Sequence, residues 1–140
     1  MIDFLVLGGH EFAPIRIAKN SFQLAVRNFE LLDGYTLRYD TGIIVKPDNE
    51  HFFIALTVAD FYTARTSIKP RGSIILHPCM LEDEISICLE FDASSTLKLL
   101  EVGEPLCTLN FLTDQELAYR IHFDEPGERH VEIVVNPLLN

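Results

Sequence analysis

Cations and hydroxyl groups lie close together in the stretch 61–72, which reads FYTARTSIKPRG. An arginine can hold a phosphate through two parallel hydrogen bonds, and neighbouring hydroxyls can donate further ones. Arg65, followed by Thr66 and Ser67, is therefore a candidate phosphate-binding site. The alternative is a turn between two strands. In that case Arg65 forms a salt bridge within an oligomer, and the hydroxyls of Thr66 and Ser67 form hydrogen bonds at the end of a strand.

Metal-binding residues are sparse in this sequence. His77 and Cys79 flank a proline, but a tetrahedral zinc site needs four ligands and no second cluster supplies the others. The cysteines, Cys79, Cys88 and Cys107, are an odd number without C-x-x-C spacing. We therefore predict no metal site, reduced thiols as in the cytoplasm, and small buried core residues at Cys88 and Cys107.

Length and charge limit the classes of function. The chain has 140 residues, of which 48% are hydrophobic, and a formal net charge of −10 at pH 7. A chain of this length and hydrophobic content can form one domain with a hydrophobic core. The acidic balance disfavours binding to nucleic acid or to anionic membranes and suits docking on a basic partner. The opening MIDFLVLGGH predicts a strand rather than a signal peptide, and no run approaches the length of a membrane span.

The pattern of short apolar runs and turn residues predicts an all-β sandwich, jelly roll or small barrel. Strands are expected at 4–7, 14–17, 22–26, 37–45 with a break at 41–42, 51–59, 73–76, 84–91, 106–112 and 131–135. Segment 84–91 alternates most clearly and predicts a half-buried strand. Thr113 with Glu116 predicts a capping box and a short helix. We expect a single domain over 1–140, with a core at about 12–112 and a C-terminal arm at about 113–140.

Four of these segments, taken in order, resemble the trimeric dUTPases and the related dCTP deaminases. They are LDG at 32–34 with YDTGIIV at 39–45, ARTS at 64–67, EISICL at 84–89 and GEPLCTL at 103–109. They cover roughly residues 20–112. The resemblance implies a dUTPase-like jelly roll, a homotrimer with active sites between subunits, and phosphate contacts from Arg65, Thr66 and Ser67.

The same comparison shows where this sequence departs from the family. Gln23 stands where the first motif carries an aspartate that orients magnesium through water, and Thr108 stands in place of the fourth motif's glutamine. The aspartate that activates water in the third motif has no clear counterpart, although Asp83 and Glu82 are candidates in a rebuilt loop. Glu82 and Glu84 are the candidates for the glutamate that the deaminases use without metal. The glycine-rich C-terminal arm has no counterpart in 124–140.

These departures predict a catalytically degenerate relative that binds a protein partner, through its acidic surface, or a deoxynucleotide. Degenerate members of the family are common among viral proteins, so the expected location is the cytoplasm, or a host cell's interior for a viral protein. An interaction protein that uses the fold only as a scaffold is a further hypothesis. The alternative is an active dUTP pyrophosphatase or dCTP deaminase with a rebuilt site, and only that alternative requires Mg²⁺.

Overall fold

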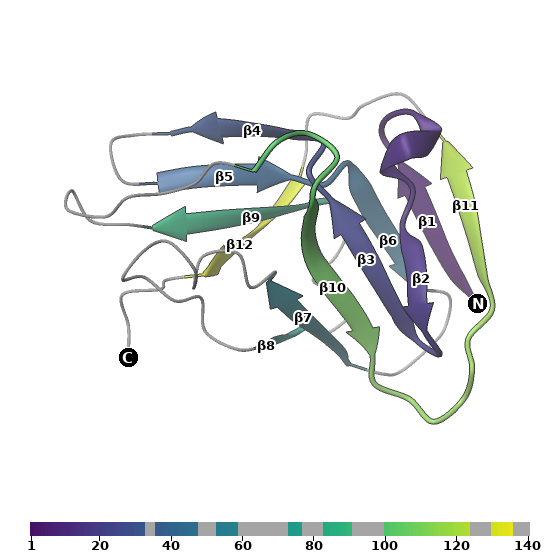
Figure 1. Cartoon of the computed structure of the whole chain (residues 1–140). Helices are drawn as coiled ribbons and strands as arrows, with labels where there is room; N and C mark the ends of the chain where they lie inside the picture. The colour runs from purple at the N-terminus through teal and green to yellow at the C-terminus, as the bar shows by residue number, and fades with distance from the viewer. Residues whose placement is uncertain are drawn as a thin grey trace.

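The computed structural model describes residues 1–32, 36–47, 53–58, 73–76, 83–90, 100–123 and 130–135. Within these ranges the chain is mostly β-strand with almost no helix, which confirms the all-β prediction (Figure 1). The elements are β1 (Ile2–Val6), the 3₁₀ helix η1 (His10–Phe12), β2 (Ile15–Ala18), β3 (Ser21–Ala25), β4 (Asn28–Leu31), β5 (Thr36–Asp40), β6 (Ile43–Pro47), β7 (Ile54–Val58), β8 (Ser73–Leu76), β9 (Glu84–Glu90), β10 (Pro105–Phe111), β11 (Tyr119–Phe123) and β12 (His130–Val135). No helix in the described ranges is long and apolar enough to cross a membrane.

The strands form three sheets. The three-stranded sheet has the order β11-β1-β6, the five-stranded sheet β2-β3-β10-β7-β8, and the four-stranded sheet β12-β9-β5-β4. Neighbouring strands are antiparallel except for two parallel pairs, β1 with β11 and β9 with β12. Among the described residues after 112, Tyr119–Phe123 (β11) belongs to the three-stranded sheet and His130–Val135 (β12) to the four-stranded sheet.

An aromatic cluster joins the three-stranded and five-stranded sheets. The ring of Phe22 on β3 lies 4.9 Å from that of Phe4 on β1, 4.9 Å from that of Tyr119 on β11, and 5.8 Å from that of Phe111 on β10. Phe4, Phe22 and Phe111 are buried. Burying such a side chain stabilises a fold by about 1.5–3 kcal/mol, so the cluster holds these two sheets face to face.

Among the connections that pass from one sheet to another, two are short and contribute residues to the site described below. The chain leaves β3 in the five-stranded sheet and enters β4 in the four-stranded sheet, with Arg27 between them. It leaves β5 in the four-stranded sheet and enters β6 in the three-stranded sheet through Thr41 and Gly42, where the sequence predicted a break. The change of strand direction between sheets is visible in Figure 1, where β4, β5 and β9 run across the view and β1, β2 and β3 run steeply.

The prediction that 84–91 is a half-buried strand is wrong for the residues that the structure describes. Side chains from Glu84 to Cys88 are all buried, whichever face of β9 they occupy. The strand is interior to its sheet, between β5 and β12. Two of its polar side chains, Glu84 and Ser86, are buried because they form hydrogen bonds with Arg27 and Asp40.

The predicted helix after Thr113 is also wrong. Residues 112–118 form no helix, and the Thr113 hydroxyl accepts a long hydrogen bond of 3.4 Å from the Gln115 amide. The buried Asn20 side chain holds this segment instead. Its Nδ2 donates to the carbonyls of Thr113 and Gln115 at 3.1 and 2.6 Å, and its Oδ1 accepts from the Leu117 amide at 3.0 Å. A side chain remote in sequence thus replaces the local capping that the motif predicted.

Candidate functional site

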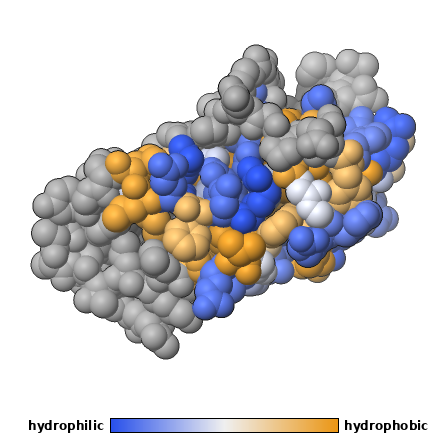
Figure 2. All heavy atoms as spheres, turned by 90° about the horizontal axis from the view of Figure 1, so that it is seen from above, coloured by the Kyte–Doolittle hydropathy of each residue, from blue (hydrophilic) through white to orange (hydrophobic). Residues whose placement is uncertain are grey.

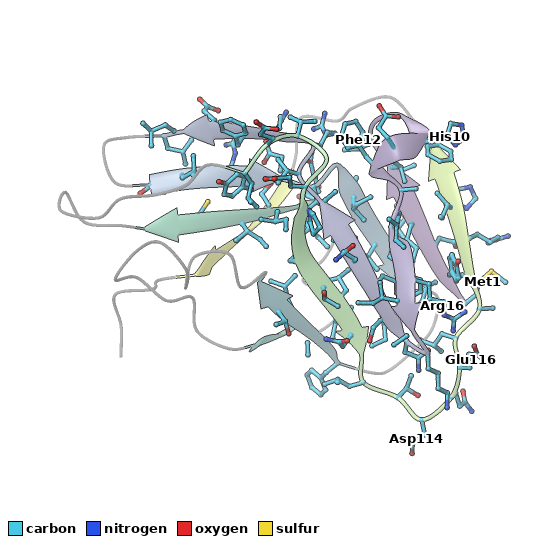
Figure 3. All side chains as sticks on the ribbon, in the orientation of Figure 1. Met1, His10, Phe12, Arg16, Asp114 and Glu116 are labelled. Atoms are coloured by element: carbon cyan, nitrogen blue, oxygen red, sulfur yellow. The ribbon has the colours of Figure 1, made fainter. Side chains whose placement is uncertain are left out.

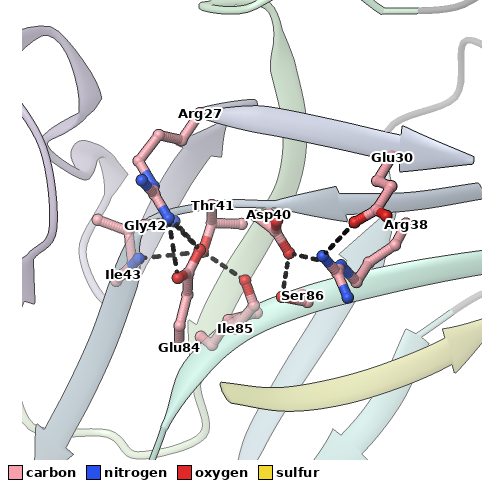
Figure 4. Close-up of polar contacts among 10 residues, drawn as sticks. All are labelled: Arg27, Glu30, Arg38, Asp40, Thr41, Gly42, Ile43, Glu84, Ile85 and Ser86. Atoms are coloured by element: carbon pink, nitrogen blue, oxygen red, sulfur yellow. Dashed lines mark hydrogen bonds and ion pairs between the residues drawn. The ribbon is translucent and has the colours of Figure 1, made fainter. Parts of the chain in front are cut away.

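A buried ion pair lies where the three sheets meet. Nη2 of Arg27 donates to both carboxylate oxygens of Glu84 at 3.0 and 3.2 Å, and the Gly42 amide donates to Oε2 at 2.9 Å (Figure 4). The exposed fraction of the side chain is 5% for Glu84 and 19% for Arg27. We call Arg27, Gly42 and Glu84 the corner cluster.

The local sequence explains this arrangement. Gly42 has φ +71°, a conformation that glycine adopts without steric cost. A Cβ at this position would lie 2.5 Å from Cδ of Arg27, so the missing side chain also makes room for the arginine to cross the chain. Residue 42 therefore supplies both the turn between β5 and β6 and one of the donors to Glu84.

A row of hydrogen bonds and ion pairs between side chains crosses the four-stranded sheet from β9 to β4. Ser86 donates to Oδ1 of Asp40 at 2.6 Å, and Nε of Arg38 lies 3.2 Å from the same oxygen. Nη2 of Arg38 donates to Oε2 of Glu30 at 3.0 Å (Figure 4). The carboxylates on this part of the sheet are thus engaged with cations or hydroxyls of neighbouring strands.

Glu84 is poorly placed for acid–base chemistry. A general base must reach the proton that it abstracts directly or through one water molecule. The carboxylate of Glu84 is buried and already accepts from Arg27 and Gly42. Its geometry is that of a structural ion pair, in which the carboxylate accepts from Nη2 of Arg27 and from the Gly42 amide. Asp83, the neighbouring candidate, is half-buried immediately before β9.

Gln23 and Thr108, two of the positions where the sequence departs from the motifs described above, lie side by side in the fold. Gln23 on β3 lies directly opposite Thr108 on β10, and Thr57 on β7 lies opposite Thr108 on its other side. All three side chains are half-buried. The resulting row across the five-stranded sheet is polar but uncharged, and it offers neutral oxygens where a hydrated Mg²⁺ favours a carboxylate.

Several predicted site residues lie outside the described ranges. They are Arg65, Thr66, Ser67, His77, Cys79 and Glu82. Among the residues that the structure does describe, no group of three or more His, Cys, Asp or Glu side chains could hold a metal ion. Cys88 and Cys107 are buried, as predicted, and burial raises the pKa of Cys107.

The sequence interpretation missed a surface cluster on the parallel strands β1 and β11. Nε and Nη2 of Arg120 donate to the two oxygens of Asp3 at 2.8 and 3.3 Å, and Nε2 of His122 lies 3.2 Å from Oδ1 of Asp3. The hydrogen bond from Arg120, and then that from His122, lowers the pKa of Asp3. Alternation in 119–123 could have predicted the strand, but not its pairing with the first strand of the chain.

The corner cluster was missed as well. A glutamate at the start of an apolar strand was the only local sign of a buried partner. Arg27 lies 57 positions away from Glu84, so no sequence spacing joins the two.

No protein-family model matches the sequence, and the comparison with curated proteins finds no match. The resemblance to the dUTPases therefore depends on the four segments alone.

Proposed function

We propose that this chain is a dUTPase-like binding domain that lacks efficient catalysis and acts by binding a protein partner or a deoxynucleotide. The observation that carries the proposal is that the carboxylate of Glu84 is buried and already paired. This carboxylate is a candidate for the deaminase glutamate, and the fold uses it to neutralise Arg27 and to hold the Gly42 amide.

The facing pair Gln23 and Thr108 supports the same proposal. In the dUTPase interpretation these positions belong to two motifs of one site, and here they are cross-strand neighbours without a carboxylate. Removing a catalytic base alone costs about 10²–10⁴ in rate. A site that has also exchanged its magnesium-orienting acid for an amide is therefore suited to binding rather than turnover.

The proposal includes a homotrimer in the cytoplasm, or in the host cell for a viral protein. Exposed apolar side chains on and beside the five-stranded sheet support subunit association, because contact between subunits would remove them from water. They are Ile15, Ile17, Phe53 and Leu112. Sedimentation equilibrium tests this part, and a mass of one chain at all concentrations would contradict it.

The experiment that tests the function combines thermal shift and turnover with dUTP, dCTP and dTTP, each with and without Mg²⁺. Ligand binding to the folded state raises the melting temperature. We expect either stabilisation by one nucleotide without product or no response, the second outcome assigning the domain to protein binding. Arg65→Ala should remove any nucleotide stabilisation. Product release at a rate that Arg65→Ala abolishes would overturn the proposal in favour of an active hydrolase.

A further inference from the structure

β4 is an edge strand of the four-stranded sheet with one side open. It pairs with β5 in the register Asn28 with Asp40 through Leu31 with Leu37. The Leu32 amide donates to the carbonyl of Thr36, which sets the phase of this ladder. Because hydrogen-bonded pairs alternate along antiparallel strands, the backbone groups of Phe29 and Leu31 point away from β5. Within the described ranges no other strand pairs with them.

The side chains of the same two residues are apolar and exposed. Phe29 and Leu31 lie on the face that carries Tyr39 and Leu37, which are buried, so the apolar face of the sheet continues to β4 and is uncovered there. Leu32 is also exposed. Figure 2 looks onto this side of the molecule and shows hydrophobic surface among hydrophilic stretches. An open row of amides beside exposed apolar side chains is the arrangement that binds an added strand.

The edge strand β2 of the five-stranded sheet differs from β4, because another segment of the chain contacts it. Arg16 on β2 donates to Glu116 at 3.0 Å, and Lys19 donates to the carbonyl of Asp114 at 2.5 Å (Figure 3). These contacts tie the segment 112–118 to the end of β2. No comparable contact is found along the outer side of β4 among the described residues.

Charges around β4 indicate the kind of partner that fits. Glu30 is exposed between Phe29 and Leu31, and the turn holding Glu101 and Glu104 bonds to Val26, two residues before β4. Arg38 is occupied by Glu30 and Asp40. The surroundings are thus acidic, in a chain with a net charge of −10.

A second copy of the chain fits this edge less well. Antiparallel pairing that sets Phe29 opposite Leu31 of another copy also sets Glu30 opposite Glu30, and like charges directly opposite one another destabilise a sheet. A strand with apolar residues on one face and lysine or arginine on the other would match both sides of β4.

We propose that β4 binds an extended segment of another protein, with alternating apolar and basic residues, as a fifth strand of the four-stranded sheet. The assignment deepens the proposed function by locating the protein-binding edge, and it rests on that function. Turnover of a deoxynucleotide would overturn the proposed function. Strand binding at β4 is tested separately, by the peptide measurement below.

The test uses a fluorescent eight-residue peptide of alternating valine and lysine, capped at both ends, and measures its anisotropy on titration with the full chain. We expect saturable binding. Leu31→Lys should weaken it by about tenfold or more, since it removes an apolar contact and adds a like charge. Phe123→Lys is the control, because Phe123 is 42% exposed on β11, an edge strand of the three-stranded sheet, and Leu31 is 59% exposed on β4.

Changes in the peptide keep the test independent of protein folding. N-methylation of one alternate set of its amides, the set that faces β4, should abolish binding, while methylation of the other set should spare it. Glutamate in place of lysine should weaken binding by about tenfold or more. No binding, equal loss in both protein variants, or indifference to methylation would overturn the proposal. So would self-association of the chain alone that Leu31→Lys abolishes and Phe123→Lys does not, since this result assigns the edge to a second copy.

Discussion

Among the Arg–Glu contacts of this protein, two of equal length have very different surroundings. Arg27 with Glu84 and Arg38 with Glu30 both measure 3.0 Å between nitrogen and oxygen, but the Glu84 side chain is 5% exposed and that of Glu30 is 62% exposed. Burial raises the cost of leaving one partner unpaired, and solvent lowers it. At the scale of the residue, environment rather than distance decides what the contact contributes.

We expect Glu84→Gln to lower the free energy of unfolding by about 2–3 kcal/mol, because the Arg27 charge is left without its counter-ion. The matched control, Glu30→Gln, should cost about 1 kcal/mol or less. Urea denaturation followed by circular dichroism measures both. Equal losses in the two variants would contradict a special role for the buried pair.

The pKa of Asp3 gives a second prediction for a single residue. Hydrogen bonds from Arg120 and His122 hold it below the ordinary value of 3.8. A lowered pKa in the folded state stabilises the fold above the unfolded value and loses this effect as the pH falls through the folded value. We therefore expect the Asp3 contribution to disappear on acidification below about 3.8. Arg120→Gln should raise the pKa of Asp3, as followed by carboxyl NMR titration, and an unchanged titration would show that Arg120 is not the main cause.

At the scale of the element, the junction between β5 and β6 depends on Gly42. The described glycines include two with positive φ, Gly42 at +71° and Gly103 at +94°. They differ in what surrounds them. A Cβ at residue 42 would clash with Arg27, whereas a Cβ at residue 103 would meet no atom within 4 Å.

Gly103→Ala should therefore cost only the strain of a left-handed alanine, about 1–2 kcal/mol. Gly42→Ala should cost clearly more, because it adds the same strain and also displaces Arg27 from Glu84. Thermal and urea unfolding of the two variants provide the measurement. If both alanines destabilise the protein equally, close packing at the corner cluster is not what requires glycine.

At the scale of the whole molecule, the net charge of −10 is the feature from which we predict how salt affects stability. Repulsion among like charges destabilises a compact state, and salt screens it over a Debye length of about 10 Å at 0.1 M. We expect sodium chloride to raise the melting temperature at pH 7. Near the sequence pI of about 4.8 this increase should vanish, because the net charge is then close to zero. The same increase at both pH values would show that salt acts by another route.

Sequence patterns correctly predicted the all-β class, most strand positions, the break at Thr41 and Gly42, and the burial of Cys88 and Cys107. These features follow from alternation, turn residues and side-chain polarity, all of which are local. β4 and β11 escaped prediction. In β4 only Phe29 and Leu31 alternate with polar residues, and four residues are too short a pattern to indicate a strand by themselves.

Tertiary structure alone decided which residues meet. Glu84 is buried because Arg27, in the connection between β3 and β4, reaches it. Asp3 contacts Arg120 because β1 pairs with β11. Strand partners and their register depend on contacts between distant parts of the chain, and no spacing within the sequence records them. The same reason explains why the open edge at Leu31 became visible only in the assembled sheet.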